Sequence, residues 1–271
     1  MAMRPFICAR NTCMEPEFQG VIRAAALDLD GTIIGPDERV TSAVKDAIVR
    51  LSARIPVFIA TGREPQDVFE YARQLGLAGP QLSDGGAAIL DPVERRHIWS
   101  ANLGPELASE VLTLIGELEA RFVATHVEGT FRRVSDIPDW DIVRISALDM
   151  SRENAEALTV RFSDHPRMSV ILASLPYNGL WAVDFTVKGV DKGSGIARMG
   201  EMLGVEPSEM ACVGDSYNDL PMLRACGLPI AMGGAPEEIR AAASLSAPPV
   251  EADGLAYAID RYILPRVTAQ H

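Results

Sequence analysis

Long apolar runs, cysteine pairs and an excess of positive charge are all missing from this chain of 271 residues. No stretch approaches the ~18 consecutive apolar residues of a membrane helix, so we expect no transmembrane segment and no membrane partner. Acidic residues outnumber basic ones by 37 to 25, which gives a formal net charge of −12. Such a chain repels a nucleic-acid backbone, so no nucleic-acid partner is expected. A small phosphate ester is not excluded, because it needs only local positive charge.

Cysteine and histidine are also scarce, and neither is arranged for metal binding. The chain has four cysteines with no C-x-x-C pair, and its four histidines are scattered, so we expect no structural zinc site. Cys212 and Cys226 lie in apolar segments and are interpreted as small core residues. Cys8 and Cys13 are expected to be unpaired thiols in a reducing compartment, and their role is left open.

Residues 1–20 lack the apolar core of a signal peptide, so they are interpreted as an irregular N-terminal extension and the default location is cytoplasmic. The rest of the chain has an ordinary globular composition, with 48% hydrophobic and 23% charged residues. At ~150 residues per domain, the length suits about two domains or one large one.

Three near-continuous apolar runs predict strands that are buried on both faces, as in a parallel sheet. They are Val21–Leu29, Ile55–Ala60 and Met210–Gly214. Helical spacing follows the first run at Ser42–Arg54, and a helix that begins at Pro65 and stops at Gly76 follows the second. The alternation of strand and helix predicts a doubly wound, Rossmann-like α/β core.

The same alternation returns near the C-terminus, but the middle of the chain has another pattern. Its helices are predicted at Pro105–Arg121 and Arg152–Phe162, and a hairpin is predicted from Met168–Leu175 and Leu180–Val187 around Asn178-Gly179. This α+β pattern indicates a cap domain at 88–183, inserted into a catalytic core formed by 21–87 and 184–271. Further predicted elements are strands at 96–100, 122–127, 130–134, 141–148 and 228–232, and helices at 193–203, 220–225, 236–243 and 255–264.

Two carboxylates leave the carboxyl end of the first strand, in Asp28-Leu29-Asp30-Gly31-Thr32. Ligands of open α/β sheets bind at this end of the strands. A carboxylate here can attack phosphorus and form an aspartyl-phosphate, while a second one protonates the leaving oxygen and then deprotonates water. Gly31 permits a tight turn, and Thr32 offers a hydroxyl and an amide to a phosphate oxygen. The alternative is an acidic turn after an edge strand.

Other polar groups follow the remaining strands. Thr61-Gly62-Arg63 comes after the second apolar run, and Lys192 stands just before a helix N-terminus, where anions bind. Alone, each is more typical of a turn or of a solvated charge. Asp215, Asn218 and Asp219 follow the third run, and the two acids can complete an oxygen-rich Mg²⁺ site. A chance origin of both acidic motifs, each at the end of an apolar strand, is improbable.

On these motifs the chain resembles the haloacid dehalogenase superfamily of phosphohydrolases, and within it the Cof-type branch (subfamily IIB) with a large α/β cap. The resemblance covers Val21 to Leu264. It implies Asp28 as the nucleophile and Asp30 as the acid/base. It also implies that Thr61 and Lys192 bind the transferring phosphate.

The resemblance further implies that Asp28, the backbone oxygen of Asp30, and Asp215 hold Mg²⁺, while Asn218 and Asp219 complete the site. Asp28, Asp30, Asp215 and Asp219 form the expected metal set. The expected phosphate- and substrate-binding set is Thr61, Gly62, Arg63, Lys192 and Asn218. One departure is Asp84 in Ser83-Asp84-Gly85-Gly86-Ala87, where relatives often have Asn-Gly-Ala.

The expected function is Mg²⁺-dependent hydrolysis of a small phosphorylated metabolite, such as a sugar phosphate, through an aspartyl-phosphate. One alternative is a phosphomutase or phosphotransferase of the same fold, and another is a non-catalytic phospho-aspartate signalling module. The cap is expected to choose the substrate, with Gly85-Gly86 and Lys188-Gly189 as its tethers. The spacing of Gly193, Gly195 and Gly200 misses the dinucleotide fingerprint. The substrate and the oligomeric state stay open.

Overall fold

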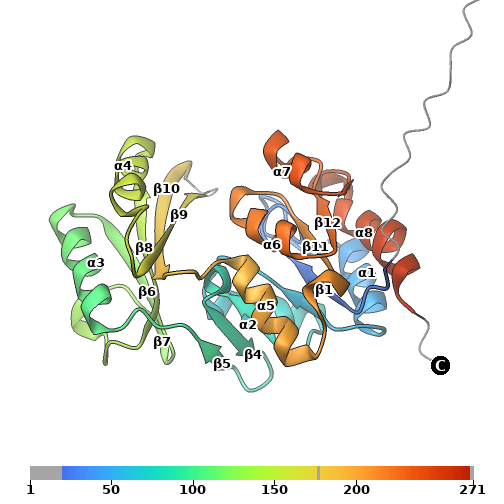
Figure 1. Cartoon of the computed structure of the whole chain (residues 1–271), viewed down its shortest axis with the longest axis horizontal. Coiled ribbons are helices and arrows are strands. Elements are labelled where there is room, and N and C mark those ends of the chain that lie inside the picture. Colours follow the sequence, from blue (N-terminus) through green and yellow to red (C-terminus); the bar gives the residue numbers. More distant parts are fainter. Residues whose placement is uncertain (1–19, 176–177, 269–271) are drawn as a thin grey trace, which may run out of the picture.

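The computed structural model of the chain describes residues 20–175 and 178–268. Within these ranges a parallel sheet of five strands has the order β13-β12-β11-β1-β2 (Figure 1). Leu27, near the end of β1, lies beside Ile59 of β2 and Val213 of β11, so these strands end at one edge of the sheet. The strands are Ala24–Leu27 (β1), Val57–Ile59 (β2), Met210–Gly214 (β11), Leu228–Ala231 (β12) and Leu245–Ser246 (β13).

Helices cover both faces of this sheet. They are Ser42–Ser52 (α1), Pro65–Leu75 (α2), Lys192–Leu203 (α5), Leu220–Ala225 (α6), Glu237–Ala242 (α7) and Gly254–Ala258 (α8). Ala25 and Leu27 pack with α1, α2 and α8, whereas Ala24 and Ala26 pack with α5, α6 and α7. Successive residues of β1 thus enter two separate apolar layers, because side chains alternate along a strand. The doubly wound fold class predicted from the apolar runs is confirmed.

A second sheet is antiparallel and has the order β7-β6-β8-β10-β9. Its strands are Arg121–His126 (β6), Gly129–Phe131 (β7), Ile142–Met150 (β8), Met168–Leu175 (β9) and Leu180–Val187 (β10). Helices α3 (Pro105–Glu117) and α4 (Arg152–Phe162) pack on one face. Figure 1 shows that these helices lie on the side facing away from the parallel sheet, so the open face turns toward it.

A third, three-stranded sheet joins the two larger ones. It consists of β3 (Gln81–Ser83), β4 (Ala88–Asp91) and β5 (Arg96–Ser100), all antiparallel. Leu82 of β3 also bridges Ala60, just after β2. The division into core and cap at 88 and 183 stays a prediction. By strand pairing, β4 and β5 belong with β3, and the second large sheet continues to Val187 at the end of β10.

Several local details differ from the sequence expectations or fall outside them. The helix expected to reach Arg121 ends at Glu117, because Glu119 adopts a left-handed φ of 50° and Arg121 begins β6. Cys212 and Cys226 are buried free thiols, as expected. Of the N-terminal extension only Gly20 lies within the described residues, so the predictions for Cys8 and Cys13 lie outside them. Tyr177, which precedes the expected Asn178-Gly179 turn, also lies outside them. No helix in 20–175 or 178–268 is long and apolar enough to span a membrane.

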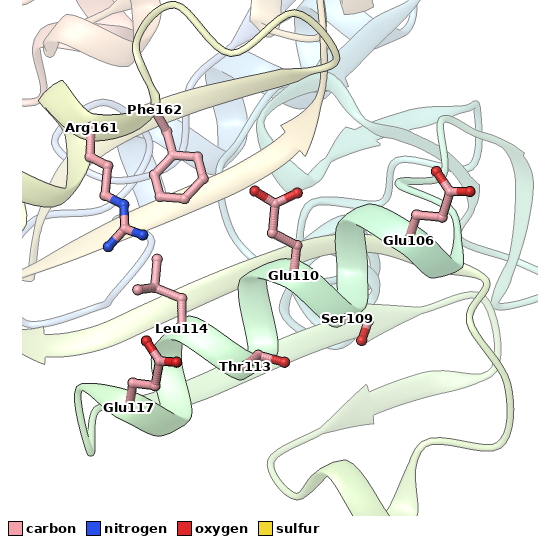
Figure 2. A pocket seen from close by; sticks show the side chains of 8 residues that line it. All are labelled: Glu106, Ser109, Glu110, Thr113, Leu114, Glu117, Arg161 and Phe162. Carbon is pink, nitrogen blue, oxygen red and sulfur yellow. The ribbon is translucent and has the colours of Figure 1, made fainter.

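A surface hollow of about 340 Å³ lies between α3 and α4 (Figure 2). Its lining includes Glu106, Glu110 and Glu117 from α3, with Arg161 and Phe162 from α4. All three glutamates would repel a phosphate, and α3, which carries them, lies on the outer side of the antiparallel sheet (Figure 1). This hollow is therefore not the expected phosphate site.

Candidate active site at the ends of the parallel strands

Expected catalytic, phosphate-binding and metal-binding residues meet where β1, β2 and β11 end. Asp28 follows β1, Thr61 comes two residues after β2, and Asp215 follows β11. Their neighbouring strands are in register, so the three loops share one edge of the sheet. The site is thus built from two parts of the sequence that the second sheet separates.

Lys192 lies at the centre of this site. Its ammonium nitrogen donates to Asp28 Oδ1 and to Asp219 Oδ1, each at 2.6 Å. All three side chains are buried, and Lys192 is only 1% exposed. Burial lowers the pKa of Lys192, but the carboxylates of Asp219 and Asp28 raise it above its ordinary value. The lysine therefore stays charged and fixes one oxygen of each carboxylate.

The start of α5 places this lysine. Lys192 is the first residue of the helix, and Asp191 is its N-cap. The Asp191 side chain accepts from the Ser194 backbone N–H at 2.8 Å, and the Ser194 hydroxyl lies 3.0 Å from the Asp191 backbone nitrogen. This reciprocal capping fixes the backbone from which the Lys192 side chain extends.

Three carboxylates gather around this single ammonium group. Asp28, Asp215 and Asp219 each offer one oxygen, and these oxygens lie within 4.8 Å of one another. Burial and the nearby Asp219 raise the pKa of Asp28, although Lys192 partly offsets them. The same two causes raise the pKa of Asp215 to about 7. The raised pKa values reflect the crowding of three carboxyl groups around one ammonium group, and a bound cation would relieve this crowding.

The donor set fits Mg²⁺, which prefers carboxylate oxygens and water. Asp215 Oδ1 is buried and has no hydrogen-bond partner within the described residues, so it can serve as a ligand. Asp28 has one oxygen bound by Lys192 and another left over. Together with Asp219, these residues make the observed acidic cluster. Asp30 was expected to contact the metal through its backbone oxygen, and that contact stays a prediction, because the acidic cluster is defined by side-chain oxygens.

Asp219 is already engaged by the protein itself. Its Oδ2 accepts from the backbone N–H groups of Asp215 and Ser216, at 2.9 and 3.0 Å, while Lys192 takes Oδ1. A Cβ at position 214 would lie 2.6 Å from the Asp219 Cγ, so Gly214 permits this close approach. These contacts make Asp219 a support for the loop that carries Asp215.

Gly31 lets the first and third loops approach each other. Its φ is +80°, and a Cβ at this position would lie only 2.1 Å from Asp215 Oδ2. Only glycine satisfies both conditions without displacing the carboxylate. Next to it, the hydroxyl of Thr32 is buried and has no partner within the described part of the chain.

Asp30 is paired with Arg63 rather than with the acidic cluster. The guanidinium Nε and Nη2 donate to its two carboxylate oxygens, at 3.0 and 2.7 Å. Arg63 also contacts Glu38 at 2.7 Å and Asp67 at 3.3 Å. Its charge is therefore shared among three carboxylates in this arrangement, and the phosphate contact expected of Arg63 stays a prediction.

The other expected phosphate-binding groups lie at the second and third loops. Thr61 is buried, and its hydroxyl oxygen accepts from the Arg63 backbone N–H at 3.1 Å. A Cβ at Gly62 would lie 3.8 Å from Asn218 Nδ2, which places the second loop next to the third. The Asn218 side-chain oxygen accepts from the Ser216 hydroxyl at 2.7 Å. The structure thus brings Thr61, Gly62 and Asn218 to one side of the cluster.

Sequence reasoning missed Arg144, which pairs with Asp84 beside these loops. Arg144 lies on β8 and is 7% exposed, and its Nε donates to Asp84 Oδ1 at 3.0 Å. A signal was available, because this arginine interrupts the apolar sequence Ile142-Val143-Arg144-Ile145. A charged residue within an apolar strand is costly unless it is paired.

Comparison with known proteins places the chain in a defined context. A family model described as haloacid dehalogenase-like hydrolase matches residues 25–135 and 135–259. YxeH of Bacillus subtilis is 23% identical over 89% of this chain and 98% of its own length. A phosphoglycolate phosphatase of Natronomonas pharaonis is 28% identical, again over 89% of this chain and 98% of its own. The structure of a haloacid dehalogenase-like hydrolase from B. subtilis matches with a TM-score of 0.78 and 20% identity, covering 89% of this chain and all of the other.

Proposed function

Because the chain belongs to the haloacid dehalogenase-like hydrolases, we propose that it is a magnesium-dependent phosphatase acting on small phosphorylated metabolites. The observation that carries this proposal is the buried Lys192 ammonium, bonded to Asp28 beside the unpartnered oxygen of Asp215. A fixed cation, a carboxylate nucleophile and a carboxylate metal ligand are then present together. Phosphate esters resist uncatalysed hydrolysis strongly enough that several such groups have to act together.

In the first step, the free oxygen of Asp28 attacks phosphorus. A bond forms between Asp28 and phosphorus, and the bond from phosphorus to the leaving oxygen breaks. Asp30 gives its proton to that leaving oxygen. Lys192 holds the other Asp28 oxygen at 2.6 Å and keeps it aligned during attack. Phosphoryl transfer depends mainly on such positioning and on charge stabilisation.

In the second step, Asp30 takes a proton from water, whose oxygen attacks the aspartyl-phosphate. The bond from phosphorus to Asp28 breaks, inorganic phosphate leaves, and both carboxyl groups return to their starting states. Mg²⁺ held by Asp28 and Asp215 would reduce the repulsion between the carboxylates and the phosphoryl oxygens.

Arg63 governs the orientation of Asp30 in this scheme. Two hydrogen bonds from the guanidinium hold the Asp30 side chain in one orientation. Protonation of Asp30 gives up at least one of them, because a protonated oxygen no longer accepts as a carboxylate does. Asp30 thus leaves part of this pairing when it serves as an acid. Its side chain is 43% exposed, which allows that movement.

The substrate class is proposed from chemistry shared by the candidates. Thr61, Lys192 and the acidic cluster address a phosphoryl group and its metal ion, which every phosphate monoester can provide. Phosphoglycolate, named for the Natronomonas relative, and sugar phosphates are the esters to test first. We place the discrimination between them in the inserted unit, predicted at 88–183.

The deciding experiment is phosphate release by the parent and by Asp28→Asn across a panel of esters with Mg²⁺. The amide is nearly isosteric but is a poor nucleophile, so turnover should be lost while the fold is kept. Asp46→Asn, which makes the same change on the exposed side of α1, is the matched control and should retain parent activity. Retention of a tenth of the activity by Asp28→Asn would exclude Asp28 as the nucleophile.

The phosphotransferase alternative has its own measurement. Hydrolysis releases one inorganic phosphate for each alcohol product, even when sugar acceptors or a bisphosphate primer are added. Transfer would instead yield a new phosphate ester and less inorganic phosphate. A stable phospho-protein with no turnover would favour a signalling module.

A further inference from the structure

A buried ion pair connects the antiparallel sheet with the turn that follows β3. Arg144 of β8 donates from Nε to Asp84 Oδ1 at 3.0 Å, and its Nη1 lies 3.4 Å from Asp184 Oδ1 on β10. Asp84 is fully buried and Arg144 is 7% exposed. Asp184 also accepts from the Ser146 hydroxyl on β8. Arg144 is therefore held by its own sheet and reaches out to the turn.

The turn itself, residues 84–86, is fixed in one shape. Asp84 has a left-handed φ of 52°, which Asp and Asn tolerate better than most residues. Its second carboxylate oxygen accepts from the Ser83 hydroxyl at 2.8 Å. Both carboxylate oxygens of Asp84 thus accept a hydrogen bond, one from Ser83 of β3 and the other from Arg144 of β8.

The same turn contacts both segments that bear the proposed phosphate-binding groups. The Asp84 backbone N–H donates to the Arg63 carbonyl at 3.1 Å, and the Gly85 N–H donates to the Thr61 carbonyl at 3.0 Å. On the other side, a Cβ at Gly86 would lie 2.1 Å from the Asp191 carbonyl oxygen. The turn is therefore packed between the Thr61 loop and the residue preceding Lys192.

Apolar packing holds the antiparallel sheet at this junction. Val143, next to Arg144, is fully buried in a cluster with Val68 and Phe69 of α2 and Leu90 of β4. Apolar contacts alone would tolerate sliding, because they are not directional. The hydrogen-bonded ion pair adds direction, because a hydrogen bond weakens when its donor and acceptor are misaligned. Removal of Arg144 would leave the buried Asp84 carboxylate without its cation.

We propose that Arg144 and Asp84 are positioning residues. Their ion pair couples the position of the antiparallel sheet to the position of the turn at 84–86, and through this turn to the positions of Thr61 and Lys192. This inference rests on the proposed function, because it assumes that Thr61 and Lys192 address the transferring phosphoryl group. That group is common to all substrates. Loosening the pair should therefore slow every substrate by a similar factor.

The test uses the double variant Asp84→Asn with Arg144→Met. It removes both charges of the Arg144–Asp84 pair, and Asp184 keeps its hydrogen bond from the Ser146 hydroxyl. Asn suits the left-handed backbone at position 84, so the fold should survive even if Arg144→Met alone does not. Arg152→Met with Glu156→Gln is the matched control, because it removes an exposed arginine–carboxylate pair from α4. Arg144→Lys, which keeps the charge, should recover part of any loss.

Two readouts are measured on folded protein. We expect kcat to fall at least tenfold, by a common factor, for p-nitrophenyl phosphate, phosphoglycolate and a sugar phosphate. Hydrogen exchange should become faster at the Asp84 and Gly85 amides and in the first turn of α5. The control should match the parent in both measurements.

Other results would overturn the proposal. Parent values of kcat and exchange in the double variant would mean that the pair only joins two parts of the fold. A changed ranking of substrates would mean that Arg144 contacts the leaving group itself. If the parent hydrolyses no ester, the proposed function fails, and hydrogen exchange in the double variant alone tests whether the ion pair positions the turn. Faster exchange then supports this role, and unchanged exchange rejects it.

Discussion

At the scale of single residues, Asp215 and Asp219 belong to one sequence motif but have different surroundings. Asp215 has a buried oxygen without a partner in the described chain, whereas Asp219 accepts from Lys192 and from two backbone N–H groups. We expect Asp215→Asn to weaken Mg²⁺ binding with little loss of stability. A carboxyl group whose pKa is higher in the folded protein than in the unfolded chain destabilises the fold when it is charged. Because the pKa of Asp215 is raised to about 7, a neutral amide at this position should cost little stability near neutral pH.

Asp219→Asn should instead lower the melting temperature clearly. An amide nitrogen in place of either oxygen would face existing donors, and Lys192 would lose one of its two carboxylates. Calorimetric titration with Mg²⁺ and thermal unfolding in chelator separate the two effects. Equal changes of Mg²⁺ affinity in the two variants, at parent melting temperatures, would make Asp219 a direct metal ligand.

Gly31 offers a second prediction at this scale. In Gly31→Ala, the new Cβ would lie 2.1 Å from Asp215 Oδ2, on a backbone with a φ of +80°. Gly204→Ala is the matched control, because Gly204 has a φ of +65° and no atom within 4 Å of a Cβ. The control should lose only the ~1–2 kcal/mol that a left-handed backbone costs an L-residue.

We expect Gly31→Ala to lose more stability than this control and to bind Mg²⁺ more weakly, because the Asp215 carboxylate is displaced. Thermal unfolding and Mg²⁺ titration of both variants provide the comparison. If the two alanine variants melt alike and bind Mg²⁺ like the parent, the contact between the two loops is not required.

At the scale of elements, the first turn of α5 carries both a cap and the central lysine. Asp191→Ala removes the hydrogen bond to Ser194 and should cost ~1 kcal/mol. It should also lower kcat several-fold, because Lys192 is the next residue. Ser151→Ala removes an equivalent cap from α4, where Ser151 accepts from the Asn154 N–H, and should cost similar stability with parent kcat. If Asp191→Ala and Ser151→Ala have equal kcat values, the Asp191 cap does not position Lys192 for catalysis.

Elements whose ends carry strong signals were predicted from sequence at their observed bounds. α4 starts after the Ser151 cap, α6 carries a proline in its first turn, and β11 ends at Gly214. The three loops of the site were also predicted, since parallel strands end at one edge. Of the sheet formed by β3, β4 and β5, only the strand at 96–100 was predicted, because short strands show little periodicity and their pairing depends on contacts outside them.

The sequence predicted at which strand ends the site residues lie, but it did not predict which side chains pair with one another. The pairing of Asp30 with Arg63 and of Asp84 with Arg144 joins residues far apart in the chain, and each depends on the direction in which a side chain leaves its loop or strand. Motif spacing carries no such information. The glycines at 85 and 86 were predicted to be a tether of the cap, which stays a prediction, and the sequence did not show that Gly86 also permits a close approach to Asp191.

At the scale of the whole molecule, the charge of the acidic cluster should make stability depend on metal. Three carboxylates, those of buried Asp28 and Asp219 and of partly buried Asp215, gather around one ammonium group, so a cation that binds only the folded state shifts the unfolding equilibrium. At 100 times its Kd, Mg²⁺ adds ~2.7 kcal/mol. This corresponds to a rise in Tm of roughly 5–10 °C for a domain of this size.

The measurement is thermal unfolding in chelator and in excess Mg²⁺, for the parent and for Asp215→Asn. The rise should be present in the parent and largely absent in the variant. A parent Tm that does not respond to Mg²⁺, while activity does, would place the metal with the substrate rather than in a protein site.

The strand order also has a consequence for synthesis on the ribosome. β11 is the middle strand of the parallel sheet and pairs with β1, yet the whole antiparallel sheet is translated between them. At about 5–20 residues per second, β1 waits roughly ten to forty seconds for this neighbour. All strands of the antiparallel sheet have by then left the ribosome or are close to doing so. A nascent chain stalled between Val187 and Met210 would hold every strand of that sheet, while its parallel sheet still lacked the middle strand.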